Sequence, residues 1–205
     1  MQATHPSSTR LLFCALLLPL LLAACEAAGP LRPGQEPPEA RATRATERGD
    51  HVAAARAWEQ AAARGEAAAR TTARLAAARA WLAAGDAAGA ERVLNGLKPP
   101  LTPGEDLERT RLLAEVALLR GDPARALALL QDPATPPTPT VAETRARALF
   151  ASNRVVEATR TMIVRERQLN DPDAISAGRR MLLAELRRAA RGSADFTAPA
   201  GADAT

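Results

Sequence analysis

The chain has 205 residues, enough for one domain with short appendages. Alanine, leucine and arginine dominate, tyrosine is absent, and aromatic residues make up 2% of the sequence, so we expect an all-α protein with little material for a sheet. The net charge of +4 is small for this length, and no basic run or aromatic platform occurs, which argues against nucleic acid as a partner.

Residues 1–24 are typical of a secretory signal peptide. Arg10 precedes an apolar stretch, 11–24, that is too short to span a bilayer and has the length of a signal-peptide core. The stretch ends in Leu-Ala-Ala-Cys at 22–25, which resembles the lipobox of bacterial lipoproteins. This resemblance implies diacylation of Cys25, cleavage before it, and acylation of its new amino terminus. The alternative is a plain secretory peptide whose cleavage site happens to contain a cysteine.

Lipidation of Cys25 would determine both the redox chemistry and the location of the mature protein. Cys14 leaves with the signal peptide, so neither a disulfide nor a cysteine metal site can form. Three acyl chains anchor a protein far more firmly than one. Residue 26 is glutamate. In similar Gram-negative lipoproteins, aspartate at this position favours the inner membrane, so we expect an outer-membrane anchor facing the periplasm.

The two ends of the mature chain differ in composition from its middle. Residues 25–38 hold the acylated cysteine and four prolines, which predicts a semi-extended tether. Residues 192–205 are small, polar and aperiodic, and we expect a disordered tail there. Between them, residues 39–191 carry a nearly continuous helical pattern and form the expected domain.

A Gly-Asp dipeptide recurs at intervals of 36 residues, at 49–50, 85–86 and 121–122. Such an interval is typical of stacked helical hairpins. Glycine can take the left-handed conformation that ends one helix, and aspartate can cap the next helix. Pro123 fits the first turn of the helix after the third dipeptide, because no amide donor is missed there. Each dipeptide therefore predicts a tight corner between two helices.

Small and large residues keep the same register around these corners. A fourth, degenerate copy places Asn153 at the glycine position, and asparagine tolerates left-handed geometry better than most residues. We expect alanines where helices approach closely, before each corner at Ala42, Ala78, Ala114 and Ala146 and after it at Ala54, Ala90, Ala126 and Ala158, and large residues filling the gaps at Trp58, Leu94, Leu130 and Met162. The pattern predicts four antiparallel hairpins stacked in a short solenoid, with residues 173–191 as a capping helix.

These positions resemble tetratricopeptide repeats over residues 40–170. Together with the lipobox, phrases such as "RLAAARAWLAAGDAAGAERVLNGL" and "RLLAEVALLRGDPARALALLQDP" resemble the N-terminal helical domain of the outer-membrane lipoprotein activators of class A penicillin-binding proteins. In that family a lipid-anchored helical arm reaches through the periplasm and a second, α/β domain touches the synthase. The resemblance covers the helical domain only.

The residues offer little for catalysis. After signal removal His51 is the only histidine, and we expect no cofactor, no metal site and no enzyme activity. We interpret His51 as a solvent-facing residue of a first helical turn. Trp58 and Trp81 occupy large-residue positions of the repeat, so we expect both in the core.

Binding of another protein is the stronger hypothesis. By the tetratricopeptide register, the first helices of the hairpins direct charged residues to a concave groove that could hold a peptide or a helix. The candidates are Arg79, Arg111, Glu115, Glu143 and Arg147. The alternative is that Arg111/Glu115 and Glu143/Arg147 are ordinary i,i+4 pairs on a solvated face.

The expected function is therefore a lipid-anchored periplasmic scaffold that recruits or regulates a peptidoglycan synthase, with a class A penicillin-binding protein as the partner. A tetratricopeptide lipoprotein scaffold for outer-membrane assembly or pilus biogenesis is the alternative within the binding class. A peptidoglycan-degrading enzyme is the competing hypothesis from the catalytic class.

Overall fold

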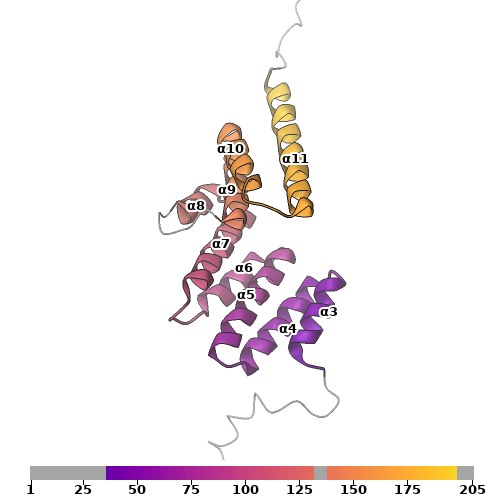
Figure 1. Ribbon diagram of the computed structural model, residues 1–205, viewed down its shortest axis with the longest axis vertical. Helices are drawn as coiled ribbons and strands as arrows, with labels where there is room; N and C mark the ends of the chain where they lie inside the picture. Colours follow the sequence, from indigo (N-terminus) through magenta and orange to yellow (C-terminus); the bar gives the residue numbers. More distant parts are fainter. Residues whose placement is uncertain (1–35, 132–137, 198–205) are drawn as a thin grey trace, which may run out of the picture.

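A computed structural model describes residues 36–131 and 138–197, and this part of the chain is all-helical, as the composition predicts (Figure 1). The helices are α3 (Pro38–Glu47), α4 (His51–Arg64), α5 (Ala67–Ala83), α6 (Ala87–Asn95), α7 (Pro103–Leu119), α8 (Pro123–Leu130), α9 (Pro139–Ala151), α10 (Val155–Glu166) and α11 (Pro172–Thr197).

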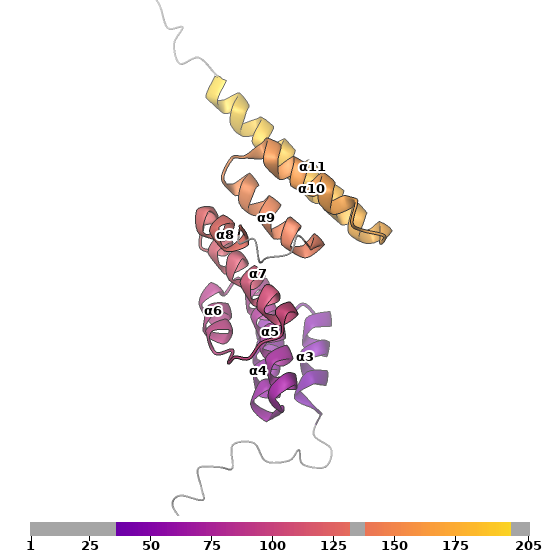
Figure 2. The same cartoon turned by 60° about the vertical axis from the view of Figure 1, so that its left-hand side comes forward.

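Eight of the helices pack as consecutive pairs, α3 with α4, α5 with α6, α7 with α8, and α9 with α10. In the third and fourth pairs the first helix also contacts both helices of the pair before it, since α7 contacts α5 and α6, and α9 contacts α7 and α8. In the second pair α5 packs against α4. The pairs follow one another along the long axis of the molecule, so that α3 and α11 lie toward opposite ends (Figures 1 and 2). α11 packs mainly on α10.

The corners within the four pairs have the predicted geometry. At the third corner the Asp122 amide donates to the Ala117 carbonyl at 2.9 Å, and the Asp122 carboxylate accepts from the Arg125 amide at 2.9 Å. Pro123 is the first residue of α8. The residue at the glycine position is left-handed in all four corners, with φ of 72° at Gly49, 78° at Gly85, 76° at Gly121 and 58° at Asn153. The helix-ending role of these residues is confirmed.

The predicted close-packing positions are also confirmed. All eight alanines of the register are 0% exposed: Ala42, Ala54, Ala78, Ala90, Ala114, Ala126, Ala146 and Ala158. The large residues Leu94, Leu130 and Met162 are buried, and Trp58 is half-buried against the core. Because an alanine side chain ends at Cβ, neighbouring helix backbones can approach one another at these points.

α7 joins the two main core clusters. Its residues Leu112 and Val116 belong to the cluster formed mainly by residues of α4, α5 and α6, whereas Ala114 and Ala117 belong to the cluster formed with residues of α8, α9 and α10. α7 itself contacts α5, α6, α8 and α9. Trp81 is buried in the first cluster, as expected. A helix buried on two sides links the two halves of the molecule into one continuous body.

The ends of the domain differ slightly from the predicted boundaries. α3 begins at Pro38, one residue before the expected domain start, and α11 continues to Thr197, past the expected start of the tail at 192. The helix can run on through the small residues after 192 because no proline interrupts them before residue 199. The signal peptide 1–24, Cys25, most of the tether 25–38 and the end of the tail 198–205 lie outside the described residues.

Candidate partner-binding groove

A surface groove crosses the first helices of three successive pairs. It has a volume of about 430 Å³. Its residues are Arg79, Leu82 and Ala83 of α5, Glu115, Leu118 and Leu119 of α7, and Arg147 of α9, and we call it the α5–α7–α9 groove. Three of the five residues proposed from the sequence therefore line one groove.

An ion-pair network lies along this groove, with Glu108 of α7 at its centre. Glu108 accepts from Arg79 at 2.8 Å and from Arg111 at 2.7 and 2.6 Å. Arg111 also donates to Glu115 at 2.5 Å, and Arg147 lies 3.7 Å from the same Glu115 oxygen. Four of the five predicted residues thus join one network that spans α5, α7 and α9.

The charges at the centre of the network are partly withdrawn from water. Burial is the largest influence on Glu108 and raises its pKa, but the hydrogen bonds and charges of Arg111 and Arg79 together outweigh it and hold the pKa below its ordinary value. Burial likewise opposes the charged form of Arg111, and the carboxylates of Glu108 and Glu115 overcome it, so that its pKa is raised. Both groups stay charged at neutral pH.

The geometry divides the network into internal and accessible groups. The Arg111 side chain is only 13% exposed and is held by two carboxylates, so it is a bridge within α7 rather than a contact for a partner. Glu115 also accepts from the hydroxyl of buried Thr144 at 3.2 Å, which ties α7 to α9. Arg79 and Arg147 are about half-exposed at the two sides of the groove.

Arg147 is the most loosely held cation of the network. Its 3.7 Å contact with Glu115 is longer than a hydrogen bond, and Glu115 is already engaged by Arg111 and Thr144. A carboxylate brought by a partner could therefore bind Arg147 without breaking a good contact. The apolar part of the groove is formed by leucines, of which Leu119 is 46% exposed, so the groove offers both an apolar surface and a cation.

Glu143 does not belong to this groove. Its carboxylate binds Arg165 of α10 at 2.5 Å, and the Arg165 side chain is 9% exposed. The sequence predicts Glu143 beside Arg147 on one face, as a groove pair or an i,i+4 pair, and the structure instead gives each residue a partner on a neighbouring helix. The other proposed i,i+4 pair, Arg111 with Glu115, forms as expected.

Two residues that hold the network beside the groove together are not predicted by the sequence pattern. Glu108 is the centre of the network, and its spacing of three residues from Arg111 is a usable signal, since i,i+3 neighbours share a helix face. Thr144 is a buried polar residue whose role depends on the packing of α9 against α7, which no spacing within α9 reveals.

His51 is the first residue of α4 and is partly buried beside its corner. Over residues 36–131 and 138–197, no group of three or more histidine, cysteine, aspartate or glutamate residues could hold a metal ion. Within the same ranges, no helix combines the length and apolarity needed to cross a bilayer.

Comparison of the chain with protein-family models, with curated proteins and with solved structures finds no match.

Proposed function

We propose that the protein is a scaffold that binds another protein of the bacterial envelope through the α5–α7–α9 groove. The observation that carries this proposal is the groove itself, where three successive helix pairs present an apolar strip next to the half-exposed Arg79 and Arg147. A groove of this kind suits a helix or an extended segment with apolar anchors and an acidic group.

We propose a tetratricopeptide-like solenoid as the architecture of the scaffold. Support comes from the four left-handed corners, from the eight fully buried alanines at repeat positions, and from the contacts of α7 with α5 and α6 and of α9 with α7 and α8. In such an array the first helices line one concave face, and the residues of the groove come from α5, α7 and α9, the first helices of three successive pairs.

We further propose that Cys25 is acylated and anchors the scaffold to the outer membrane on its periplasmic side. The support is the Leu-Ala-Ala-Cys sequence at 22–25 and the glutamate at 26. Metabolic labelling with palmitate, followed by mass spectrometry of the mature amino terminus, tests the anchor directly. Cys25→Ser should abolish labelling, Cys14→Ser should leave it intact, and a mature terminus without acyl groups would refute the anchor.

The proposed process is peptidoglycan synthesis, with a class A penicillin-binding protein as the partner. Glycan-strand polymerisation by the purified synthase should change when the protein is added. The double variant Arg79→Glu/Arg147→Glu should lose this effect and weaken synthase binding by at least about tenfold, because it places carboxylates where the partner's carboxylate would bind. Arg180→Glu/Arg187→Glu, on exposed positions of α11, makes the same change in charge away from the groove and serves as control.

Two outcomes would overturn parts of this proposal. No effect on polymerisation and no binding would remove the synthase as partner, leaving the scaffolds of outer-membrane assembly and pilus biogenesis to be tested in the same way. A cleared band on a peptidoglycan zymogram of the purified protein would overturn the scaffold and show an enzyme.

A further inference from the structure

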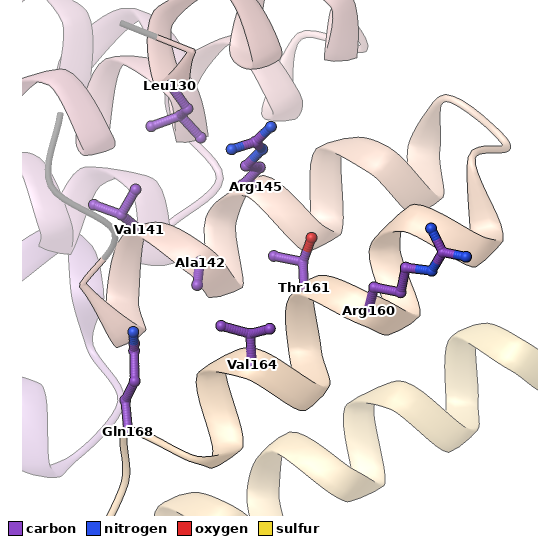
Figure 3. A pocket seen from close by; sticks show the side chains of 8 residues that line it. All are labelled: Leu130, Val141, Ala142, Arg145, Arg160, Thr161, Val164 and Gln168. Atoms are coloured by element: carbon purple, nitrogen blue, oxygen red, sulfur yellow. The ribbon is translucent and has the colours of Figure 1, made fainter. Parts of the chain in front are cut away.

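A second surface hollow lies between α9 and α10, away from the α5–α7–α9 groove. It has a volume of about 260 Å³. Its lining residues are Leu130, Val141, Ala142, Arg145, Arg160, Thr161, Val164 and Gln168, and we call it the α9–α10 trough (Figure 3). Figure 3 shows the side chain of Ala142 pointing toward Val164, with Thr161 lying between Arg145 and Arg160.

The apolar part of the trough is open to solvent. Val164 is 52% exposed. Its neighbours in the trough, Ala142 and Thr161, are small, so they leave room for a side chain from outside. The hollow is smaller than the roughly 300–1,000 Å³ pockets that enclose small molecules. Its size and openness fit one or two side chains of another protein better than an enclosed ligand.

Two cations at the trough have no carboxylate partner among the described residues. Arg145 and Arg160 are exposed, and neither takes part in an ion pair within residues 36–131 and 138–197. The charges of Arg145 and Arg160 both act on Glu157. Its pKa is lowered chiefly by the hydrogen bonds from Arg154 and further by these two charges. Glu157 is already bound by Arg154 at 2.8 and 2.6 Å, so it does not neutralise the trough.

The wider surroundings of the trough are also basic. Residues 141–191 contain eleven arginines and six acidic residues, whereas the whole chain carries a net charge of only +4. The positive charge is therefore concentrated in the last pair and α11. This positive charge would attract an acidic segment to this end of the molecule. There the segment would meet an apolar surface flanked by two guanidinium groups that can bind its carboxylates.

We propose that the α9–α10 trough docks a short segment of a second protein that carries an apolar anchor residue next to aspartate or glutamate. The anchor would pack on Val164 and Ala142, and the carboxylates would bind Arg145 and Arg160. This site is separate from the proposed groove, because Arg145 and Arg147 are two residues apart on α9 and so project from nearly opposite sides of that helix. The protein would then hold two partners at once, one on each side of α9.

Selection from a display library of short random peptides tests the chemistry of the site and requires no identified partner. The immobilised full mature domain should enrich peptides that combine leucine, isoleucine or phenylalanine with neighbouring acidic residues. Binding of an enriched peptide, measured by fluorescence anisotropy, should weaken by at least about tenfold in Arg145→Glu/Arg160→Glu and should weaken as salt is raised. Val164→Asp tests the apolar anchor and should weaken binding similarly, since Val164 is already half-exposed and its replacement leaves the core intact.

Controls distinguish this site from the groove and from a membrane surface. Arg180→Glu/Arg187→Glu matches the charge change of the trough variant but leaves the two trough cations in place, so it should weaken peptide binding much less than the trough variant does. Two outcomes would overturn the proposal. The selection would yield no peptides that combine apolar and acidic residues, or the selected peptide would lose binding in Arg79→Glu/Arg147→Glu and keep it in the trough variant. If the protein binds phosphatidylglycerol vesicles more strongly than any selected peptide, and Arg145→Glu/Arg160→Glu loses this binding, then the trough binds anionic lipid instead of a protein. None of these readouts depends on the synthase, so the trough and the proposed function can fail separately.

Discussion

Gly104 and Gly121 have open space around them, but their backbones differ. A Cβ added at either residue would meet nothing within 4 Å, yet Gly121 has φ of 76° and Gly104 lies in the first turn of α7. A left-handed backbone costs an ordinary residue about 1–2 kcal/mol, whereas glycine takes it without that penalty. The two glycines therefore isolate the contribution of backbone conformation from that of side-chain contacts.

Gly121→Ala should lower the free energy of unfolding by about 1–2 kcal/mol and the Tm by roughly 2–8 °C, because the corner between α7 and α8 needs the left-handed residue. Gly104→Ala should be neutral or slightly stabilising, since alanine is the better helix former. Thermal unfolding followed by circular dichroism measures both. Gly121→Asn should fall between the two, as the fourth corner uses Asn153 in the same conformation. Equal Tm values for the two alanine variants would contradict this account of the corner.

Glu59 makes the stability of the folded protein depend on pH. Its carboxylate accepts from Arg92 at 3.0 and 2.8 Å and from the Trp81 indole at 2.6 Å, linking α4, α5 and α6. The Arg92 hydrogen bond is the main reason that the pKa of Glu59 lies below its ordinary value of 4.5, against the opposing effect of partial burial. A carboxyl group with a lowered pKa in the folded state stabilises the fold above its ordinary pKa, and this contribution is lost as the pH falls through the folded pKa.

Glu59→Gln should therefore cost about 1 kcal/mol at neutral pH, and its deficit relative to the unmodified protein should shrink as the pH is lowered from about 5 to 3. Glutamine keeps an acceptor for Trp81 but cannot pair with the charge of Arg92. Chemical denaturation at a series of pH values measures the difference. Glu66→Gln, at the exposed start of α5 where the side chain caps nothing, is the control. A deficit for Glu59→Gln that is the same at all pH values would contradict the ionic origin.

At the scale of helices, the approach of α6 to α5 depends on a glycine within a helix. Gly89 of α6 is buried, and a Cβ there would lie 2.9 Å from the Trp81 ring and 2.7 Å from the capping carboxylate of Asp86. Alanine in place of a helical glycine stabilises an isolated helix by up to about 1 kcal/mol. At Gly89 the overlap with Trp81 and Asp86 opposes that gain.

Gly89→Ala should consequently destabilise the protein, by about 1–3 kcal/mol, because α6 must move away from the tryptophan or lose its cap. Guanidinium denaturation gives the stability, and near-ultraviolet circular dichroism or tryptophan fluorescence reports the displacement of Trp81. Gly104→Ala, also within a helix but in open space, shows the ordinary sign of the substitution. A stabilised Gly89→Ala variant with unchanged tryptophan spectra would mean that α5 and α6 pack less closely than the structure has them.

The helices and corners could be derived from sequence, but the partners of many charges could not. Gly-Asp dipeptides and alanine spacing act through local geometry, so spacing alone indicates the roles of Gly85 and Ala90. A long arginine side chain on a packed helix reaches neighbouring helices as easily as its own next turn. Glu143 therefore pairs with Arg165 across α9 and α10 instead of with Arg147, and the α5–α7–α9 groove exists only once three helices are in place.

At the scale of the whole molecule, contacts pass from each helix pair to the next, and α11 is held mainly by α10. The Arg179 guanidinium of α11 pairs with Glu166 of α10. Buried Arg165 also lies beside α11; its guanidinium binds Glu143, and its Nε has no hydrogen-bond partner among the described residues. A Cβ at Gly178 of α11 would lie 2.7 Å from Arg165 Nη1. In an array in which each pair contacts only its neighbours, a substitution that disrupts the α10–α11 contact should leave the earlier helix pairs folded.

Gly178→Leu should therefore release α11 from α10 without unfolding the rest of the protein. In native-state hydrogen exchange, amides of α11 should exchange at least about tenfold faster than in the unmodified protein, whereas those of α5, α6 and α7 should keep their protection. Ala184→Leu adds the same bulk at an exposed position of α11 and should leave exchange unchanged. A uniform loss of protection from α3 to α11 would show instead that the chain unfolds as a single cooperative unit. In that case the two binding surfaces on α9 could not be perturbed independently, because any strain at α10 would reach the α5–α7–α9 groove through α9 and α7.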